Sequence, residues 1–244
     1  MARRGRRVAI SLIVVLVVLS GLLVAADRVA AYAAEKTIAK KVAQQTKDLG
    51  IESSAPEVTI GGFPFLTQVA DGRYQDIAIV LRNVSKNGVT LPVLDVHATG
   101  ITATMDTLMS GNGPVTADKV VGTGTVRYDS VRAVVNQPGL ELTESGGRLR
   151  LRWPVTISGQ QVTATAVGDV TVNAGTVQLK VSDIKAEGIT LPAIAQRLLD
   201  DYAKKLSVAI NLQLLPFHLR LESVRALPEG LAISASAQGV PISG

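Results

Sequence analysis

The chain has 244 residues and contains no cysteine. This absence excludes disulfides, thiol catalysis, cysteine-ligated metal centres and lipid attachment to cysteine. Aromatic residues make up only 3% and charged residues 18%, whereas hydrophobic residues reach 47%. The apolar content is therefore mainly Val, Ile, Leu and Ala, which suits pleated sheets. We infer a folded chain that depends on its hydrophobic core alone for stability.

The formal net charge of +5 does not describe a basic surface. Four of the 25 Lys and Arg residues lie at the N-terminal tip, and the rest nearly balance the 20 Asp and Glu residues. These four are Arg3, Arg4, Arg6 and Arg7. Proteins that bind nucleic acid need basic residues clustered on the folded part of the chain. We therefore expect no nucleic-acid partner.

Catalytic signatures are also scarce. The chain has two histidines, His97 and His218, and each lies in a segment of strand-like alternation. Zinc-protease and nucleophile-elbow motifs are missing from the sequence. The glycines of Gly122-Thr123-Gly124 lack the Lys and Ser/Thr of a phosphate loop and are interpreted as a turn. We predict that the protein is not an enzyme and uses no cofactor or metal.

A long apolar segment follows the basic tip. Val8–Ala26 contains 19 residues without a charge, which as a helix would span about 28 Å, close to the hydrocarbon thickness of a bilayer. The preceding arginines should stay cytoplasmic, which places Asp27 and later residues outside. An uncleaved signal anchor is favoured by this length, although Val24-Ala25-Ala26 also fits a cleavage site. We predict a protein of the cell envelope at the outer face of the cytoplasmic membrane, anchored or released by cleavage.

Three regions are expected along the chain. Residues 1–26 form the basic tip and the transmembrane or signal segment. Residues 27–50 form a helical stalk or first helix, with Asp27 as its N-cap and Gly50 just after its end. Residues 51–244 form a β-rich domain.

Alternating hydrophobic residues predict strands in the third region. The expected strands are Arg73–Leu81, Val93–Met105, Arg148–Ile157, two within Val162–Val181, Phe217–Val224 and Leu231–Ala237. An amphipathic helix is expected over Leu191–Ala209, and a shorter one over Thr116–Val121 or Asp129–Val135. We predict an α+β fold in which a long, curved antiparallel sheet wraps around one or two helices, as in tubular lipid-binding proteins. A closed sandwich with an ordinary core fits the same pattern.

One motif resembles a known family. Gly61-Gly62-Phe63-Pro64-Phe65-Leu66-Thr67-Gln68, followed by Gly72 and Tyr74, is similar to the signature of the LmeA-like phospholipid-binding proteins of actinobacterial envelopes. Leu215-Pro216-Phe217 and the turn at Pro228–Leu231 resemble the same family. The resemblance implies a tubular lipid-binding fold, phospholipid ligands including phosphatidylinositol, and a role in assembling envelope glycolipids such as lipomannan. It also suggests an envelope glycosyltransferase as a partner.

The resemblance supplies no ligand contacts, so the candidate lipid-binding residues come from the chain's own aromatic and aliphatic residues. They are Phe63, Phe65, Leu66, Ile77, Ile79, Trp153, Leu215 and Phe217. Rigid aromatic residues beside a proline can line the rim of a groove or enter a membrane interface, but can equally belong to the core. Candidates for headgroup contact are Arg73, Lys86 and the arginines of Arg148–Arg152. A membrane-anchored scaffold that binds no lipid is the main alternative function.

Overall fold

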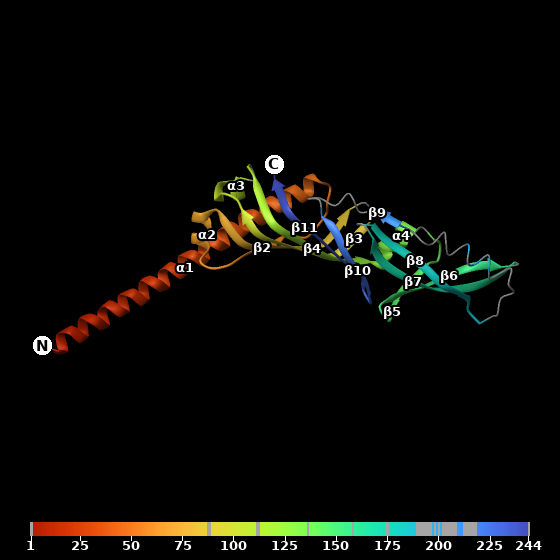
Figure 1. The fold of residues 1–244 in the computed structure, drawn as a ribbon, viewed down its shortest axis with the longest axis horizontal. Coiled ribbons are helices and arrows are strands. Elements are labelled where there is room, and N and C mark those ends of the chain that lie inside the picture. The colour runs from red at the N-terminus through yellow and green to blue at the C-terminus, as the bar shows by residue number, and fades with distance from the viewer. Residues whose placement is uncertain are drawn as a thin grey trace.

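The computed structural model describes residues 2–86, 89–110, 113–135, 137–157, 159–173, 176–188, 197, 199, 201, 209–211 and 219–243. Figure 1 shows an elongated molecule in which a long N-terminal helix projects from one end and two sheets follow one another along the body. Leu215 and Phe217 lie outside the described residues, as does His218.

The N-terminal helix α1 runs without a break from Ala2 to Asp48. It is long and apolar enough to cross a membrane, and its large apolar side chains between Leu12 and Val24 are exposed. The helix ends at Gly50, whose φ of 67° and N–H bond to the Lys47 carbonyl match the expected C-terminal stop. The predicted N-cap role of Asp27 is wrong, because the apolar segment and the following helix are continuous and Asp27 lies inside α1.

The strands form two antiparallel sheets. Sheet A contains, in spatial order, β1 (Glu57–Gly61), β2 (Arg73–Lys86), β3 (Val89–Thr102), β4 (Val115–Arg127), β11 (Gly230–Ser243) and β10 (Arg220–Leu227). Sheet B contains β5 (Glu141–Ser145), β6 (Arg148–Ile157), β7 (Gln160–Asn173), β8 (Thr176–Ala186) and β9 (Ala209–Asn211). The chain therefore builds most of sheet A, then sheet B, and returns to sheet A with its last two strands.

Within the described part of the chain, three short helices border the sheets. They are α2 (Phe65–Asp71), α3 (Met105–Ser110) and α4 (Tyr128–Val135). The helix α4 confirms the second of the two alternatives for a short helix, whereas Thr116–Val121 belongs to β4. Of the helix predicted over Leu191–Ala209, only Arg197, Leu199 and Asp201 are described as helical.

The α+β class is confirmed, but the single sheet wrapped around helices is not. The strands divide between two sheets, and the described strands form no closed or tubular sheet. The interpretation of Gly122-Thr123-Gly124 as a turn is also wrong, because these residues lie in the middle of β4. Sequence alternation identifies a strand but not its neighbours, since strand pairing depends on contacts between distant segments.

The hydrophobic core has two large parts and a small part between them. The first part joins α1 to sheet A, with Ala31, Ala34 and Ile38 packed against residues such as Ile77 and Ile101. The second part joins sheet B to α4 and to the far end of sheet A, around Leu151 and Trp153. A small cluster of Val177, Leu221 and Ala235 lies where the two sheets meet. The apolar sides of both sheets are thus parts of one interior.

Candidate functional site

The strand register places an aliphatic surface on one side of sheet A, which we call the apolar face. Three paired rows cross the central strands. They are Ile77–Ala98–Val120–Ala237, Ile79–Val96–Gly122–Ala235 and Leu81–Leu94–Gly124–Ile233. Polar residues such as His97 and Ser236 belong to the rows of the opposite face. The helix α1 packs on the apolar face at the end where Tyr74, Ile101 and Ala117 lie.

The middle of the apolar face is less densely packed than a closed core. Several of its side chains are only partly buried, among them Ile79, Leu94, Val96, Ala98, Ile233 and Ala237. Gly122 is buried, yet a methyl group built on its α-carbon would meet no described atom within 4 Å. At Gly168 in sheet B the same group would lie 2.8 Å from the Leu179 side chain and 2.9 Å from that of Leu151. Protein interiors are normally filled as at Gly168, whereas the described residues leave Gly122 without such close neighbours.

One buried polar group belongs to this interior. The Tyr74 side chain is almost fully buried and packs beside Phe65, with ring centroids 6.4 Å apart. Its hydroxyl has no hydrogen-bond partner among the described residues. Burial raises the pKa of the Tyr74 hydroxyl, so the group stays protonated and can donate a hydrogen bond. An unpaired hydroxyl in an apolar interior is unfavourable unless a ligand pairs with it.

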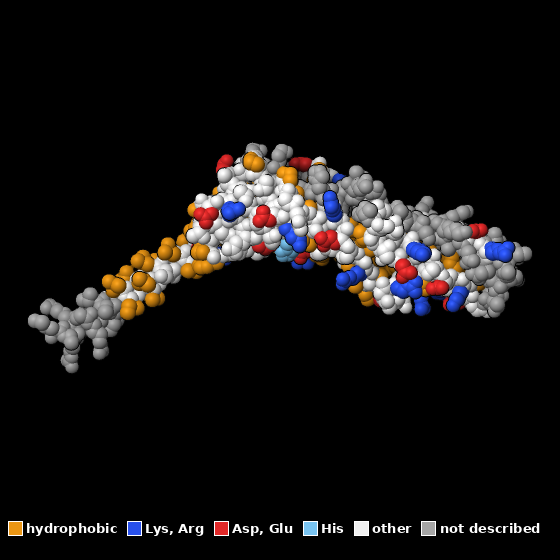
Figure 2. Space-filling view, viewed as in Figure 1, with side chains coloured by type: hydrophobic (Ala, Val, Ile, Leu, Met, Phe, Trp, Pro, Cys, Tyr) orange, Lys and Arg blue, Asp and Glu red, His pale blue; other side chains and the backbone are white. Residues whose placement is uncertain are grey.

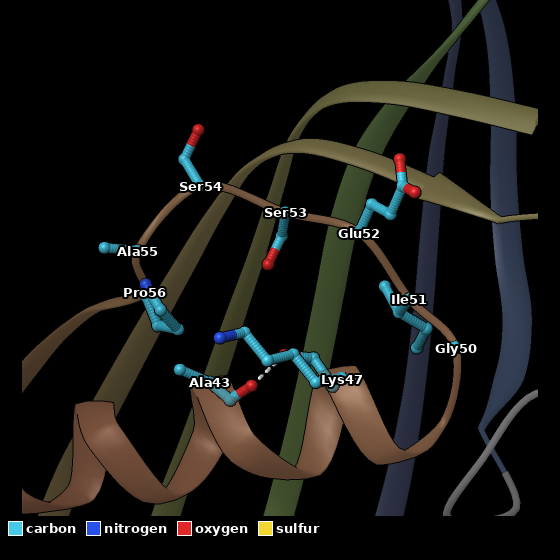
Figure 3. A pocket seen from close by; sticks show the side chains of 10 residues that line it. Ala43, Lys47, Gly50, Ile51, Glu52, Ser53, Ser54, Ala55 and Pro56 are labelled. Atoms are coloured by element: carbon cyan, nitrogen blue, oxygen red, sulfur yellow. Dashed lines mark hydrogen bonds between the residues drawn. The ribbon is translucent and has the colours of Figure 1, made fainter.

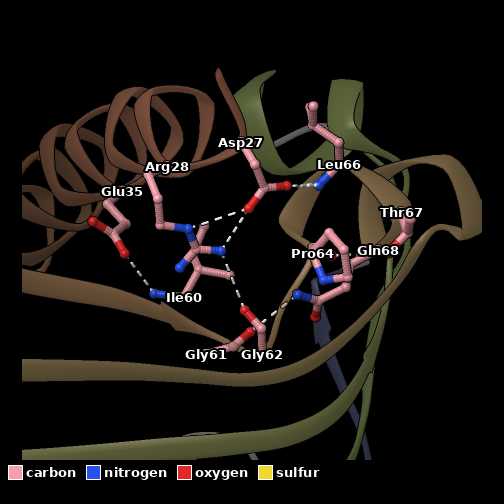
Figure 4. A network of polar contacts seen from close by, with 10 residues as sticks. All are labelled: Asp27, Arg28, Glu35, Ile60, Gly61, Gly62, Pro64, Leu66, Thr67 and Gln68. Atoms are coloured by element: carbon pink, nitrogen blue, oxygen red, sulfur yellow. Dashed lines mark hydrogen bonds and ion pairs between the residues drawn. The ribbon is translucent and has the colours of Figure 1, made fainter. Parts of the chain in front are cut away.

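The segment Gly61–Gln68 connects sheet A to α1 through a group of polar contacts (Figure 4). The Asp27 carboxylate accepts a hydrogen bond of 2.8 Å from the Leu66 N–H in the first turn of α2. Asp27 therefore caps α2 and not the helix that contains it. Arg28 donates to the Asp27 carboxylate at 2.6 Å and lies over the Phe63 ring, 5.1 Å from its centroid. The Asp27–Leu66 and Arg28–Phe63 contacts join residues 39 and 35 positions apart in the chain.

Further contacts complete this connection. The Glu35 carboxylate accepts a hydrogen bond of 2.9 Å from the Ile60 N–H in β1. The Gln68 side chain donates to the Gly61 carbonyl and accepts from the Gln75 N–H, so it ties α2 to both β1 and β2. The Phe63–Pro64 peptide bond is cis. The segment is therefore held on several sides by neighbouring elements.

The predicted lipid-binding residues separate into three groups. Phe65, Ile77 and Ile79 come together in the core beside α1. Trp153 lies in the distal core of sheet B and does not join them. Phe63 is 56% exposed, and Leu66 is exposed as well, so both side chains point outward whereas Phe65 is only 2% exposed. Leu215 and Phe217 fall outside the described residues.

The candidate headgroup arginines on β6 are largely engaged in ion pairs. Arg148 contacts the Asp169 carboxylate at 2.6 Å and 2.7 Å, and Arg152 contacts Glu187 at 2.6 Å. The hydrogen bond from Arg148 lowers the pKa of Asp169, and the hydrogen bond to Glu187 raises the pKa of Arg152. Because β6 alternates, these arginines lie opposite the side chains of Leu149, Leu151 and Trp153. Arg73, Lys86 and Arg150 are exposed.

The structure offers little for catalysis or metal binding within its described part. His97 lies on the polar face of sheet A, with its ring nitrogens 3.5 Å from Asp76 and 3.1 Å from Asp95. This group is open to solvent, and the described residues hold no cluster of three or more metal-ligating side chains. The pair Asp200 and Asp201 cannot be compared in space, because Asp200 is outside the described residues.

A separate pocket of about 620 Å³ lies at the end of α1, under the loop that leads to β1 (Figure 3). Its lining residues are Ala43, Thr46, Lys47 and the loop residues from Gly50 to Pro56. The lining combines two serines, one lysine and a carboxylate with small apolar groups. It contains none of the predicted lipid-binding residues.

Sequence reasoning missed Gly122 and the Asp27–Leu66 contact. Small residues recur where the apolar face is open, at Ala98, Gly122, Gly124, Ala235 and Ala237. These Gly and Ala residues on one face of three strands are the signal that could have indicated reduced filling. It becomes visible only when β4 is aligned with β11.

These features define a protein with a membrane-length apolar helix joined to a β-sheet body whose aliphatic face is only partly buried. Residues 25–236 match the family described as LmeA-like phospholipid-binding, and the chain belongs to this family. Searches among curated proteins and among solved structures returned no significant match. The family assignment covers α1 from the end of its apolar segment through the first half of β11.

Proposed function

We propose that this protein is a membrane-anchored phospholipid-binding protein of the cell envelope that shelters acyl chains on the apolar face of sheet A. The observation that carries the proposal is that no described atom lies within 4 Å of a methyl group built on Gly122, in an aliphatic row of sheet A. Membership in a phospholipid-binding family agrees with an aliphatic ligand at this place. The protein acts as a carrier or receptor of lipid and has no catalytic role.

The dimensions of the apolar face suit an acyl chain. From Ala117 to Val126 along β4 the strand advances nine residues, which corresponds to about 30 Å. This length extends from the core beside α1 to the residues packed near Trp153. Removing aliphatic area from water contributes about 25 cal/mol per Å², so the acyl chains supply most of the binding free energy. Phe65, Ile77 and Ile79 would line the near end and Trp153 the far end, with Leu215 and Phe217 as additional contacts.

The polar part of the ligand would lie at the end near α1. Here the Tyr74 hydroxyl is the buried donor, and Arg73 is an exposed cation next to it in β2. Lys86 and Arg150 are exposed but belong to other ends of the sheets. Phosphatidylinositol is the headgroup that we would test first, and delivery of such lipids to envelope glycolipid assembly, with a glycosyltransferase as partner, is the proposed biological role.

Native mass spectrometry of the full chain tests the proposal. The wild-type protein, purified in detergent from a bacterial host, should carry one phospholipid per chain. Gly122→Leu should lose this lipid, because the new side chain occupies the space beside the sheet. Gly122 has no left-handed backbone conformation, so a leucine is compatible with its strand geometry.

Thr123→Leu is the matched control, since it places the same leucine side chain at the next position of β4 on the opposite, exposed side. It should retain the lipid. The amount of lipid bound loosely around the apolar helix should be the same in the wild type and in both variants. Equal retention by wild type and Gly122→Leu would contradict the proposed site, and a wild-type protein that neither carries nor takes up phospholipid would favour the scaffold function.

A further inference from the structure

Exposed apolar side chains continue beyond the membrane-length segment of α1 (Figure 2). Val29 and Tyr32 on the helix are 69% and 60% exposed, and Phe63 and Leu66 of the adjoining segment are also exposed. We call these four residues the exit belt. The contacts of Leu66 with Asp27 and of Phe63 with Arg28 place all four at one level of the helix. Exposed large apolar residues gathered in this way mark a surface that binds a partner or a membrane.

The exit belt lies at a defined distance from the apolar segment. At 1.5 Å per residue, Tyr32 is about 9 Å beyond Ala26 along the helix. The polar interface of a bilayer extends about 5–8 Å beyond each side of its hydrocarbon core. If Val8–Ala26 fills the hydrocarbon, the exit belt falls in the headgroup region and its outer boundary. Aromatic side chains are enriched at this depth.

Basic groups accompany the aromatic rings of the exit belt. Arg28 lies over the Phe63 ring at 5.1 Å, and Lys36 lies over the Tyr32 ring at 5.3 Å. An apolar ring capped by a cation suits an interface where acyl chains meet phosphate groups. The chemistry of the exit belt therefore matches a phospholipid surface.

The segment with Phe63 and Leu66 is fixed relative to α1. The Asp27–Leu66 and Glu35–Ile60 hydrogen bonds join its two ends to the helix. Ala31 and Ala34 of the helix are buried against the core beside the same segment. Because these contacts bracket the exit belt, the helix and the segment behave as one rigid unit, and a membrane-spanning α1 brings Phe63 and Leu66 to the bilayer surface.

We propose that the exit belt inserts into the headgroup region of the outer leaflet and docks the near end of sheet A directly on the bilayer. The inference rests on the proposed function only in taking α1 as a retained anchor. Docking would let a phospholipid pass between the leaflet and the apolar face without crossing water. The proposal excludes an arrangement in which α1 acts as a stalk and holds the sheets away from the membrane.

Spin labels can measure the depth of the exit belt. The chain has no cysteine, so Phe63→Cys, Leu66→Cys and Thr143→Cys each carry a single label in the full-length protein. Thr143 is an exposed residue of β5 in sheet B and is the matched control. The proteins are reconstituted in vesicles of phosphatidylcholine and phosphatidylglycerol, and power saturation compares collisions with oxygen and with a water-soluble nickel complex.

Labels at Phe63 and Leu66 should favour oxygen over nickel several-fold more than the label at Thr143. Nickel accessibility as high at both positions as at Thr143 would overturn the docking proposal. Adding Gly122→Leu to each labelled chain separates the two proposals. Docking predicts that the labels at Phe63 and Leu66 keep the same depth in the Gly122→Leu background. If Gly122→Leu loses bound lipid and the labels keep their depth, the change affects the apolar face and not the docking.

Discussion

At the scale of residues, the motif Gly61–Gln68 divides its apolar side chains between two environments. Phe65 enters the core beside Tyr74, whereas Phe63 and Leu66 remain exposed. A family motif of this kind thus combines a structural residue with residues available to a membrane. The two environments arise because α2 begins at Phe65, and successive side chains of a helix point to different sides of it.

Phe65→Ser and Phe63→Ser should therefore differ in stability. Phe65→Ser removes a buried ring and should lower the free energy of unfolding by about 3–5 kcal/mol. Phe63→Ser should change it by less than about 1 kcal/mol, because only exposed contacts and the Arg28 interaction are lost. Denaturant unfolding followed by circular dichroism in detergent measures both. Similar losses in the two variants would mean that Phe63 is also a core residue.

The Tyr74 hydroxyl gives a second prediction at this scale. Tyr74→Phe should leave the free energy of unfolding of the lipid-free protein unchanged or raise it by up to about 1 kcal/mol, because it removes an unpaired buried hydroxyl. It should weaken phospholipid binding about 5- to 10-fold if the hydroxyl donates to the bound lipid. Thermal unfolding and lipid titration check the two parts. A destabilised lipid-free variant would show that the hydroxyl has a protein partner.

At the scale of elements, α1 connects the membrane to the body through the cap that it supplies to α2. The Asp27 carboxylate is buried and bonded to the Leu66 N–H and to Arg28. The helix packs on sheet A through small side chains at Ala31 and Ala34, which allow a close approach. The position of the exit belt thus depends on a few contacts on one side of α1.

Asp27→Ala should loosen this connection. Loss of a helix N-cap costs about 0.5–2 kcal/mol, and the Leu66 N–H would lose its partner. Asp48→Ala, which changes an exposed aspartate at the end of the same helix, should cost less than about 0.5 kcal/mol. Amide hydrogen exchange should show faster exchange at Leu66 in Asp27→Ala only. Unchanged protection at Leu66 would contradict the role of Asp27 as cap.

The elements that could be predicted are those whose pattern is local. Arg148–Ile157 was predicted with its observed bounds because charged and apolar residues alternate along the whole strand. The end of α1 at Gly50 follows from a glycine that adopts a left-handed conformation. Asp27 was misassigned because a capping residue looks the same in the sequence whether it caps its own helix or one about 40 residues later.

At the scale of the whole molecule, the core extends from the membrane end of sheet A to the far end of sheet B (Figure 1). The division into two sheets could not be predicted, since β10 and β11 join sheet A only after the chain has built sheet B. For the same reason Trp153 and Phe65 could be identified as apolar candidates but not placed at opposite ends. The open region at Gly122 arises from strand pairing and has no local signature.

The location of bound lipid is the most direct test of this account. A phospholipid with a photoreactive diazirine near the end of an acyl chain is incorporated into membranes that contain the full-length protein, and adducts are mapped by peptide mass spectrometry. We expect adducts in the apolar helix and also in β3, β4 and β11, around Val96 and Ile233. Gly122→Leu should abolish only the adducts in the strands. Adducts confined to residues 8–26 of the wild-type protein would contradict the central claim that the apolar face of sheet A holds phospholipid.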